Sequence, residues 1–212
     1  MQIDTMALGD FQTNCYIVRE SPQTKTCTII DPGYDAHELV EFLQREELSP
    51  QRILLTHGHA DHIAGIPLLG KNFDDPPVSI GRDEAVMLRD NRLNLSVFSP
   101  EPLQLADADT LFEPGDVLEF AGSTFDVLAT PGHTPGSVSF YCQAQNCLFA
   151  GDALFAGSIG RTDFPGGNHQ TLLESIRQAL LVLPDDTLVY PGHGPATTIG
   201  RERASNPFLL TE

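Results

Sequence analysis

The sequence predicts an α/β fold in which two β-sheets lie face to face and helices cover their outer faces. Short runs typical of strands and amphipathic runs typical of helices form two successive groups along the chain, and such grouping is typical of layered folds. At 212 residues and 41% hydrophobic content, the chain is long enough to bury a core without disulfides. We therefore expect a single domain over residues 1–212.

The first group opens with three predicted strands separated by polar turns, over residues 1–8, 14–19 and 26–31. Residues 35–47 carry apolar side chains at helical spacing, and Asp35 is placed to cap the N-terminus of that helix. The apolar run at 52–55 predicts the next strand, and residues 83–91 predict a second helix.

The second group contains two predicted hairpins and one strongly amphipathic helix. The hairpins pair residues 117–120 with 124–129 and residues 137–142 with 147–150. The helix covers residues 172–183 and is stopped by Pro184. Two irregular stretches, at 73–77 and 96–114, are rich in proline or acidic side chains and predict surface loops that border a cleft.

The most informative segment is Thr56-His57-Gly58-His59-Ala60-Asp61-His62, which follows the predicted strand at 52–55. Its four potential metal ligands lie within six positions, in a loop at a strand end, where functional residues concentrate. His57 and His59 are two positions apart, so an extended backbone places both imidazoles on one face, where they can hold one ion. Asp61 and His62 are adjacent and point in different directions, which suits a second ion.

Three further motifs present a single histidine or aspartate beside glycine or proline, each after an apolar run: Thr130-Pro131-Gly132-His133-Thr134-Pro135-Gly136, Ala150-Gly151-Asp152 and Tyr190-Pro191-Gly192-His193-Gly194-Pro195. Glycine lets the backbone approach an ion closely, and proline stiffens the turn. Five of the seven histidines lie in the four motifs, which disfavours the alternative of a solvated polar loop with incidental histidines. Imidazoles and carboxylates without a thiolate suit zinc, iron or manganese.

With these motifs, nearly the whole chain resembles the metallo-β-lactamase fold superfamily, whose signature is an HxHxDH run followed by separated His, Asp and His. The resemblance implies an αββα sandwich that binds two divalent metal ions, zinc in preference to iron or manganese. It implies one metal on His57, His59 and His133. It implies the second on Asp61, His62 and His193, with Asp152 bridging the two.

The segment 154–167 resembles a loop of glyoxalase II-like hydroxyacylglutathione hydrolases and of the related persulfide dioxygenases. The segments at 191–195, 197–200 and 206–209 resemble short bacterial glyoxalase II-like hydrolases more closely. Long glyoxalase II enzymes carry a C-terminal helical domain that supplies glutathione contacts, and we expect none here. The resemblance therefore covers the hydrolytic centre better than it covers selectivity for glutathione.

The resemblance implies a hydrolase for a small-molecule thioester, a glutathione conjugate such as S-(2-hydroxyacyl)glutathione. A metal-bridging hydroxide attacks the carbonyl, and Asp61 and Asp152 act at this centre as ligands of the metals. The family pattern also implies that Arg161 binds a carboxylate of the glutathione moiety, since guanidinium matches a carboxylate with two hydrogen bonds. The alternative is that Arg161 pairs with Asp163 and holds its loop.

Two other functions compete with thioester hydrolysis. A mononuclear iron dioxygenase acting on glutathione persulfide would use a triad of His57, His133 and Asp152. A non-catalytic binding protein on the same scaffold is disfavoured by the complete ligand set. Asp31, which precedes Pro32 and Gly33 at a strand end, either orients a ligand histidine or caps a turn.

The formal charge of −17, with twelve scattered basic residues, disfavours nucleic-acid partners, because phosphates are neutralised by clustered Lys and Arg. No run approaches the ~20 apolar residues that span a bilayer, and the N-terminus has no signal-peptide pattern. We therefore expect a cytoplasmic protein that does not bind membranes. The four cysteines lie in apolar runs without CxxC spacing, which predicts buried, reduced thiols. The oligomeric state stays open.

Overall fold

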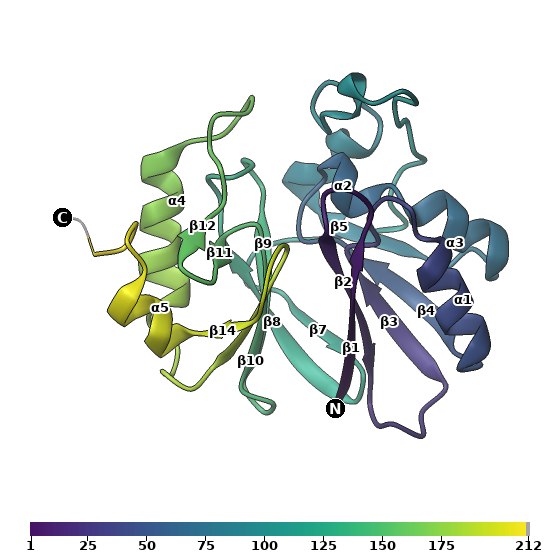
Figure 1. Cartoon of the computed structure of the whole chain (residues 1–212), viewed down its shortest axis with the longest axis horizontal. Coiled ribbons are helices and arrows are strands. Elements are labelled where there is room, and N and C mark those ends of the chain that lie inside the picture. The colour runs from purple at the N-terminus through teal and green to yellow at the C-terminus, as the bar shows by residue number, and fades with distance from the viewer. Residues whose placement is uncertain (211–212) are drawn as a thin grey trace.

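Two six-stranded sheets pack face to face in the computed structural model, which describes residues 1–210 (Figure 1). The first sheet has the order β1-β2-β3-β4-β5-β6. Its strands are Gln2–Leu8 (β1), Thr13–Arg19 (β2), Thr26–Ile30 (β3), Ser49–Leu54 (β4), Val78–Gly81 (β5) and Thr110–Phe112 (β6). β1 to β3 form the predicted antiparallel meander, and β3 to β6 pair in parallel.

The second sheet has the order β14-β13-β10-β9-β8-β7. Its strands are Val117–Phe120 (β7), Ser123–Ala129 (β8), Val138–Cys142 (β9), Cys147–Gly151 (β10), Leu188–Pro191 (β13) and Thr197–Thr198 (β14). β7 pairs with β8 and β9 pairs with β10 as antiparallel neighbours, which confirms both predicted hairpins. A small hairpin outside the main sheets joins Leu154–Phe155 (β11) to Ser158–Ile159 (β12).

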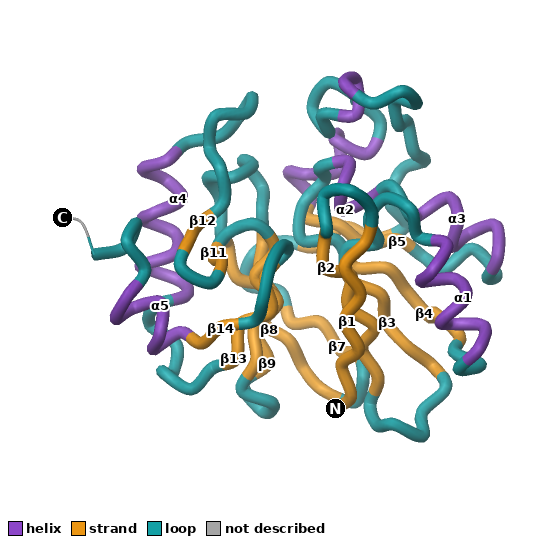
Figure 2. Tube along the Cα trace, in the orientation of Figure 1, coloured by secondary structure: helices purple, strands orange, loops and turns teal. Residues whose placement is uncertain are grey.

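Helices cover the outer face of each sheet (Figure 2). The α-helices are His37–Arg45 (α1), Ala60–Ile63 (α2), Ile66–Asn72 (α3), His169–Ser175 (α4) and Ile199–Ser205 (α5). Two 3-10 segments lie at Arg82–Leu88 (η1) and Ser96–Phe98 (η2), and a π-helical turn, Ile176–Leu180 (η3), continues α4. α1 and α3 lie outside the first sheet and α4 and α5 outside the second (Figure 1), which confirms the predicted αββα layering.

Alternation along the strands explains the layering. In β2, Ile17 packs into the cluster beneath α1, whereas its neighbour Val18 packs into the cluster between the sheets. In β10, Phe149 faces the space between the sheets, and Leu148 faces the layer that contains α4. Successive side chains of a strand point to opposite faces. A strand that is apolar at every position therefore belongs to a sheet buried on both sides.

The chain leaves several strands at the same edge of the sandwich. β10 and β13 run parallel, and β8 has the direction of β10 because each is antiparallel to β9. Their carboxyl ends therefore meet at one sheet edge, as those of parallel strands do. The motif at residues 56–62 leaves the end of β4 in the facing sheet (Figure 1). All four sequence motifs thus come from strand ends.

Some predicted elements differ in the structure. The cap prediction for Asp35 was wrong: α1 begins after Ala36 without a side-chain cap, and Asp35 takes a left-handed φ of 52°. The segment 83–91 forms the 3-10 segment η1 rather than an α-helix, and the predicted helix at 172–183 changes to π geometry at Ile176. β6 lies within the expected loop at 96–114.

All four cysteines are buried and free, as their apolar surroundings predict. Burial raises the pKa of Cys27 to about 12, which keeps that thiol protonated. Among the described residues, no helix is both long and apolar enough to cross a membrane.

Candidate metal centre

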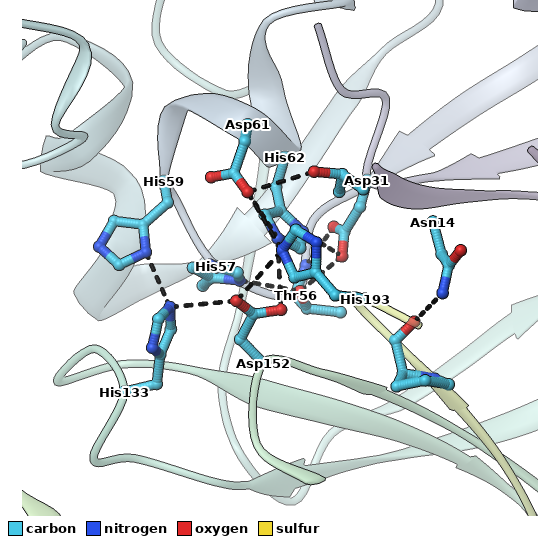
Figure 3. Close-up of polar contacts among 12 residues, drawn as sticks. Asn14, Asp31, Thr56, His57, His59, Asp61, His62, His133, Asp152 and His193 are labelled. Carbon is cyan, nitrogen blue, oxygen red and sulfur yellow. Dashed lines mark hydrogen bonds and ion pairs between the residues drawn. The ribbon is translucent and has the colours of Figure 1, made fainter. Parts of the chain in front are cut away.

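Every residue that the motifs single out as a metal ligand lies in one cluster between the two sheets (Figure 3). After β4, the chain runs through His57 and reaches α2, whose N-cap is His59. Asp61 and His62 belong to α2 itself, so this short helix turns both side chains toward the cluster. The second sheet supplies the remaining residues from the loops after β8, β10 and β13: His133, Asp152 and His193.

Three histidines form the first group. His57, His59 and His133 each offer a nitrogen, and these atoms lie within 4.8 Å of one another. The ring centroids of His57 and His59 are 4.9 Å apart, and those of His59 and His133 are 4.6 Å apart. These are the residues predicted to share the first metal.

The second group contains Asp61, His62 and His193, whose ligand atoms also lie within 4.8 Å of one another. Oδ2 of Asp61 is 3.2 Å from Nε2 of His193 and 3.6 Å from Nε2 of His62. These residues are those predicted to share the second metal.

Asp152 lies between the two groups. One oxygen, Oδ2, is 3.4 Å from Nε2 of His133, and the other, Oδ1, is 3.4 Å from Nε2 of His62. The close approach requires glycine at position 192, because a Cβ there would overlap Oδ1 of Asp152 and lie 2.9 Å from Cε1 of His62. A carboxylate in this position can reach an ion in either group.

Hydrogen bonds show which nitrogen each histidine turns toward the cluster. Nδ1 faces an oxygen in four of them: Thr56 Oγ1 for His57 at 3.1 Å, Asp31 Oδ2 for His62 at 3.0 Å, the Arg161 carbonyl for His133 at 2.7 Å and the Phe11 carbonyl for His193 at 3.0 Å. An imidazole that donates from Nδ1 keeps the lone pair on Nε2. His59 is reversed, and its Nδ1 lies 2.8 Å from Nε2 of His133.

Buried polar atoms of the cluster fit a metal better than they fit a protein core. Among the described residues, Nε2 of His57, Nε2 of His62 and Oδ1 of Asp152 are buried without a hydrogen-bond partner. Buried polar atoms without partners are rare in native proteins, and an ion is one accepted explanation. The donor set of five imidazoles and two carboxylates suits zinc, iron or manganese.

The pKa values of the cluster residues also favour the binding of a cation. Burial, followed by the neighbouring His133, lowers the pKa of His59 to about 3. Burial alone would lower the pKa of His193, but hydrogen bonds to Asp152 and Asp61 raise it to about 10. Burial likewise opposes the charge on Asp152, yet His62 and His193 hold the pKa of that carboxyl well below its usual range. His59 therefore presents a neutral nitrogen ligand, and the carboxylate of Asp152 attracts a cation.

Asp31 holds His62 of the cluster in place through a hydrogen bond. Its carboxylate accepts hydrogen bonds from the backbone N–H of Thr56 at 2.9 Å, from the Thr56 hydroxyl at 2.6 Å and from Nδ1 of His62 at 3.0 Å. Of the two roles considered for Asp31, the contacts support the orientation of a histidine.

Glu84 joins the loops that carry the first group, and the sequence contains no signal for it. This fully buried residue of η1 accepts hydrogen bonds from the backbone N–H of Gly58 at 2.9 Å and from that of Gly136 at 2.8 Å. Gly58 lies between His57 and His59, and Gly136 follows His133 by three positions. One carboxylate therefore links a loop of each sheet.

Strand β2 positions the His193 loop. The side-chain amide of Asn14 donates to the carbonyl of Pro191 at 3.0 Å, and its backbone N–H donates to the carbonyl of Gly192 at 2.7 Å. The hydroxyl of Tyr16 donates to the same Pro191 carbonyl at 2.5 Å. These contacts place His193 opposite Asp61, and the sequence alone does not indicate them.

A cleft of about 680 Å³ opens onto the cluster. Arg161 lies on its wall, where its guanidinium donates two hydrogen bonds of 2.7 Å to Asp163 and sits 3.9 Å from the ring centre of Phe164. The hydrogen bonds to Arg161 lower the pKa of Asp163 to about 2, so the pair is charged at neutral pH. The pairing with Asp163 is the alternative considered above, and a substrate-binding role for Arg161 stays a prediction.

Comparison with known proteins places these observations in a family. Residues 8–193 match the model of the metallo-beta-lactamase superfamily. The chain is 40% identical over 205 residues to "Probable metallo-hydrolase YqgX" of Bacillus subtilis, covering 96% of this chain and 95% of that protein. It is 38% identical over 219 residues to "Hydroxyacylglutathione hydrolase GloC" of Haemophilus influenzae, covering 99% of this chain and 98% of that protein.

Solved structures agree with this assignment. The crystal structure of BLEG-1 B3 metallo-beta-lactamase superposes with a TM-score of 0.91 at 44% identity, covering 99% of this chain and 100% of that one. A di-iron-bound crystal structure of TTHA1623 superposes with a TM-score of 0.84 at 37% identity, covering 97% of this chain and 100% of that one.

Proposed function

We propose, because this chain belongs to the metallo-β-lactamase superfamily, that it is a dinuclear metal-dependent hydrolase of thioesters such as S-(2-hydroxyacyl)glutathione. The main support is the position of Asp152 between the two ligand groups. Its Oδ2 lies 3.4 Å from Nε2 of His133, and its Oδ1 lies 3.4 Å from Nε2 of His62. The similarity to the relative named hydroxyacylglutathione hydrolase supports the substrate class.

The side chains divide the work of holding the metals. His57, His59 and His133 would hold one ion, Asp61, His62 and His193 the other, and Asp152 both. When bound, two divalent ions, with zinc preferred over iron or manganese, would supply a hydroxide near neutral pH and polarise the thioester carbonyl. Asp61 would act as a ligand, and its negative charge would lower the Lewis acidity of the ion that it holds.

The chemistry of the leaving group matches this site. A thioester releases a thiolate, whose conjugate thiol has a pKa of about 8.5. That group departs without a strong general acid, unlike the amine released from an amide. Burial would raise the pKa values of the cluster carboxylates, Asp61 and Asp152, but charge attraction to His62 and hydrogen bonds from His193 lower both. Neither is therefore available as an acid at neutral pH, and thioesters are the substrates that do not need one.

The test is thiol release from S-lactoylglutathione by the metal-loaded protein. We expect hydrolysis that falls with a chelator and returns with zinc, iron or manganese. Elemental analysis of the protein as isolated should give two metal ions per chain. Absence of thiol release from a preparation that holds two metal ions would contradict the proposal, and a β-lactam assayed in parallel would show whether an amide is cleaved instead.

The alternative is a mononuclear iron dioxygenase that acts on glutathione persulfide. His57, His133 and Asp152 would form its triad, and the 3.4 Å between His133 Nε2 and Asp152 Oδ2 is compatible with a shared ion. Oxygen uptake on glutathione persulfide, with one iron per chain and no thioester hydrolysis, would establish that function instead. The complete second ligand group favours the hydrolase.

A further inference from the structure

Four phenylalanines from separate parts of the chain line the cleft above the cluster. Phe11 lies in the turn between β1 and β2, Phe98 ends η2, Phe155 belongs to β11, and Phe164 lies in the loop before α4. We call these four residues the aromatic wall. No repeat or periodicity relates them, so only the fold brings them together.

The aromatic wall runs from the mouth of the cleft to the imidazoles. Phe98 is 84% exposed and Phe11 is 64% exposed, so both side chains are largely accessible to solvent at the mouth of the cleft. Phe155 meets His193 edge-on with ring centres 6.0 Å apart, and Phe164 meets His59 in the same way at 5.8 Å. Large exposed apolar side chains gathered around a cleft mark a ligand surface rather than a folding requirement.

The charges of the cleft are unfavourable for glutathione. Apart from the cluster residues, the acidic and basic side chains on its described wall are Asp10, Asp35 and Arg161. Arg161 is already matched by Asp163 through two hydrogen bonds. At neutral pH a glutathione moiety carries one ammonium group and two carboxylates, and the carboxylates would face acidic side chains in a chain of formal charge −17. A neutral apolar group carries no carboxylate, so these acidic side chains do not repel it and it needs no free arginine.

We infer, on the basis of the proposed thioester hydrolysis, that the preferred substrate is a thioester with an aromatic or branched aliphatic group, which packs against the aromatic wall. The apolar group belongs either to the acyl side or to the thiol side of the thioester. Phe98 and Phe11 contact this group at the mouth of the cleft, and S-lactoylglutathione is hydrolysed as a poorer substrate.

Three thioesters separate the two sides. S-lactoylglutathione is polar on both, S-phenylacetylglutathione is apolar on the acyl side, and the benzyl thioester of lactate is apolar on the thiol side. We expect at least one apolar thioester to have a kcat/KM about tenfold or more above that of S-lactoylglutathione, a range that a hydrophobic contact can supply. The apolar thioester with the higher kcat/KM shows whether the acyl side or the thiol side of the substrate contacts the aromatic wall.

Variants test whether the aromatic wall causes the preference for an apolar thioester. In Phe98→Ser and Phe11→Ser, the ratio of kcat/KM between the preferred apolar thioester and S-lactoylglutathione should fall about tenfold. The Phe11 carbonyl that meets His193 is backbone and survives the change. Val182→Ser is the control, because Val182 is 70% exposed and does not line the cleft. Its ratio should stay that of the parent.

Two results would overturn the inference: a parent enzyme that prefers S-lactoylglutathione, or a ratio that neither phenylalanine variant changes. Failure of the proposed function looks different, because no thioester would then be cleaved. In that case calorimetry with benzyl methyl sulfide, which contains no thioester, still tests the wall. Binding that weakens in Phe98→Ser but not in Val182→Ser would support an apolar site without hydrolysis, and equal or absent binding would reject it.

Discussion

Asp31 and His62 form a buried contact of 3.0 Å between Oδ2 and Nδ1, and the same carboxylate holds the Thr56 hydroxyl. Asp31 directly follows β3, whereas His62 lies on α2, so the contact joins the end of a strand to a helix of the first sheet layer. Since Nδ1 is occupied, Nε2 of His62 points toward Asp61 and Asp152. Asp31 thereby sets the orientation of one ligand without lying at the open cleft.

Replacing Asp31 with Asn should weaken metal binding about 10–100-fold, the usual effect of losing a partner of a ligand histidine. The amide has one oxygen where the carboxylate has two, so its NH2 group must face either the backbone N–H of Thr56, which now donates to Oδ1, or the Thr56 hydroxyl and His62 Nδ1, which share Oδ2. Metal affinity is measured by competition with a chromogenic chelator. Asp35→Asn is the matched control, because Asp35 shares the left-handed φ of 52° but is exposed. Equal losses in both variants would contradict the assigned role of Asp31.

His59→Ala should lose activity by more than the about 10–100-fold expected for a partner of a ligand. It should also lose one equivalent of metal, because His59 contributes Nδ1 to the first group. Its circular dichroism should match that of the parent, since ligand loops lie outside the packed core. His37→Ala, which removes an exposed histidine, serves as the control. Retention of two metals by His59→Ala would refute its assignment as a ligand.

Glu84→Ala should lower the free energy of unfolding by about 2–4 kcal/mol, because the N–H groups of Gly58 and Gly136 lose their acceptor inside the protein. Glu84→Gln keeps one acceptor oxygen and should lose about half as much. Urea denaturation of the metal-free protein measures both. Glu113→Ala removes an exposed carboxylate paired with Arg82 and should stay within about 0.5 kcal/mol of the parent. A similar small loss in Glu84→Ala would show that the link between the loops is unimportant.

Arg161→Ala distinguishes the two roles considered for this side chain. Because Asp163 already occupies the guanidinium, we expect KM for S-lactoylglutathione to change less than about twofold, in line with a weak exposed ion pair. Asp163→Asn frees the guanidinium and should lower that KM, since a free Arg can bind a carboxylate with two hydrogen bonds. A marked rise of KM in Arg161→Ala, with little change in kcat, would instead show that Arg161 binds substrate.

The sequence by itself determined the layered architecture and the identity of the seven candidate ligands. Local spacing carries that information. In strands such as β2 and β10, successive apolar residues must serve opposite faces, and the run from His57 to His62 concentrates four donors at one strand end. Geometry was less predictable: Asp35 does not cap α1, and η1 is a 3-10 segment rather than an α-helix.

Only the tertiary structure decided which side chains support and surround that site. Glu84 reaches Gly58 across 26 positions and Gly136 across 52, and His59 meets His133 across 74. The aromatic wall and the partners of Nδ1 likewise come from separate loops. Such contacts leave no periodic pattern in the chain, because each depends on where two sheets place their strand ends rather than on the spacing between neighbouring residues.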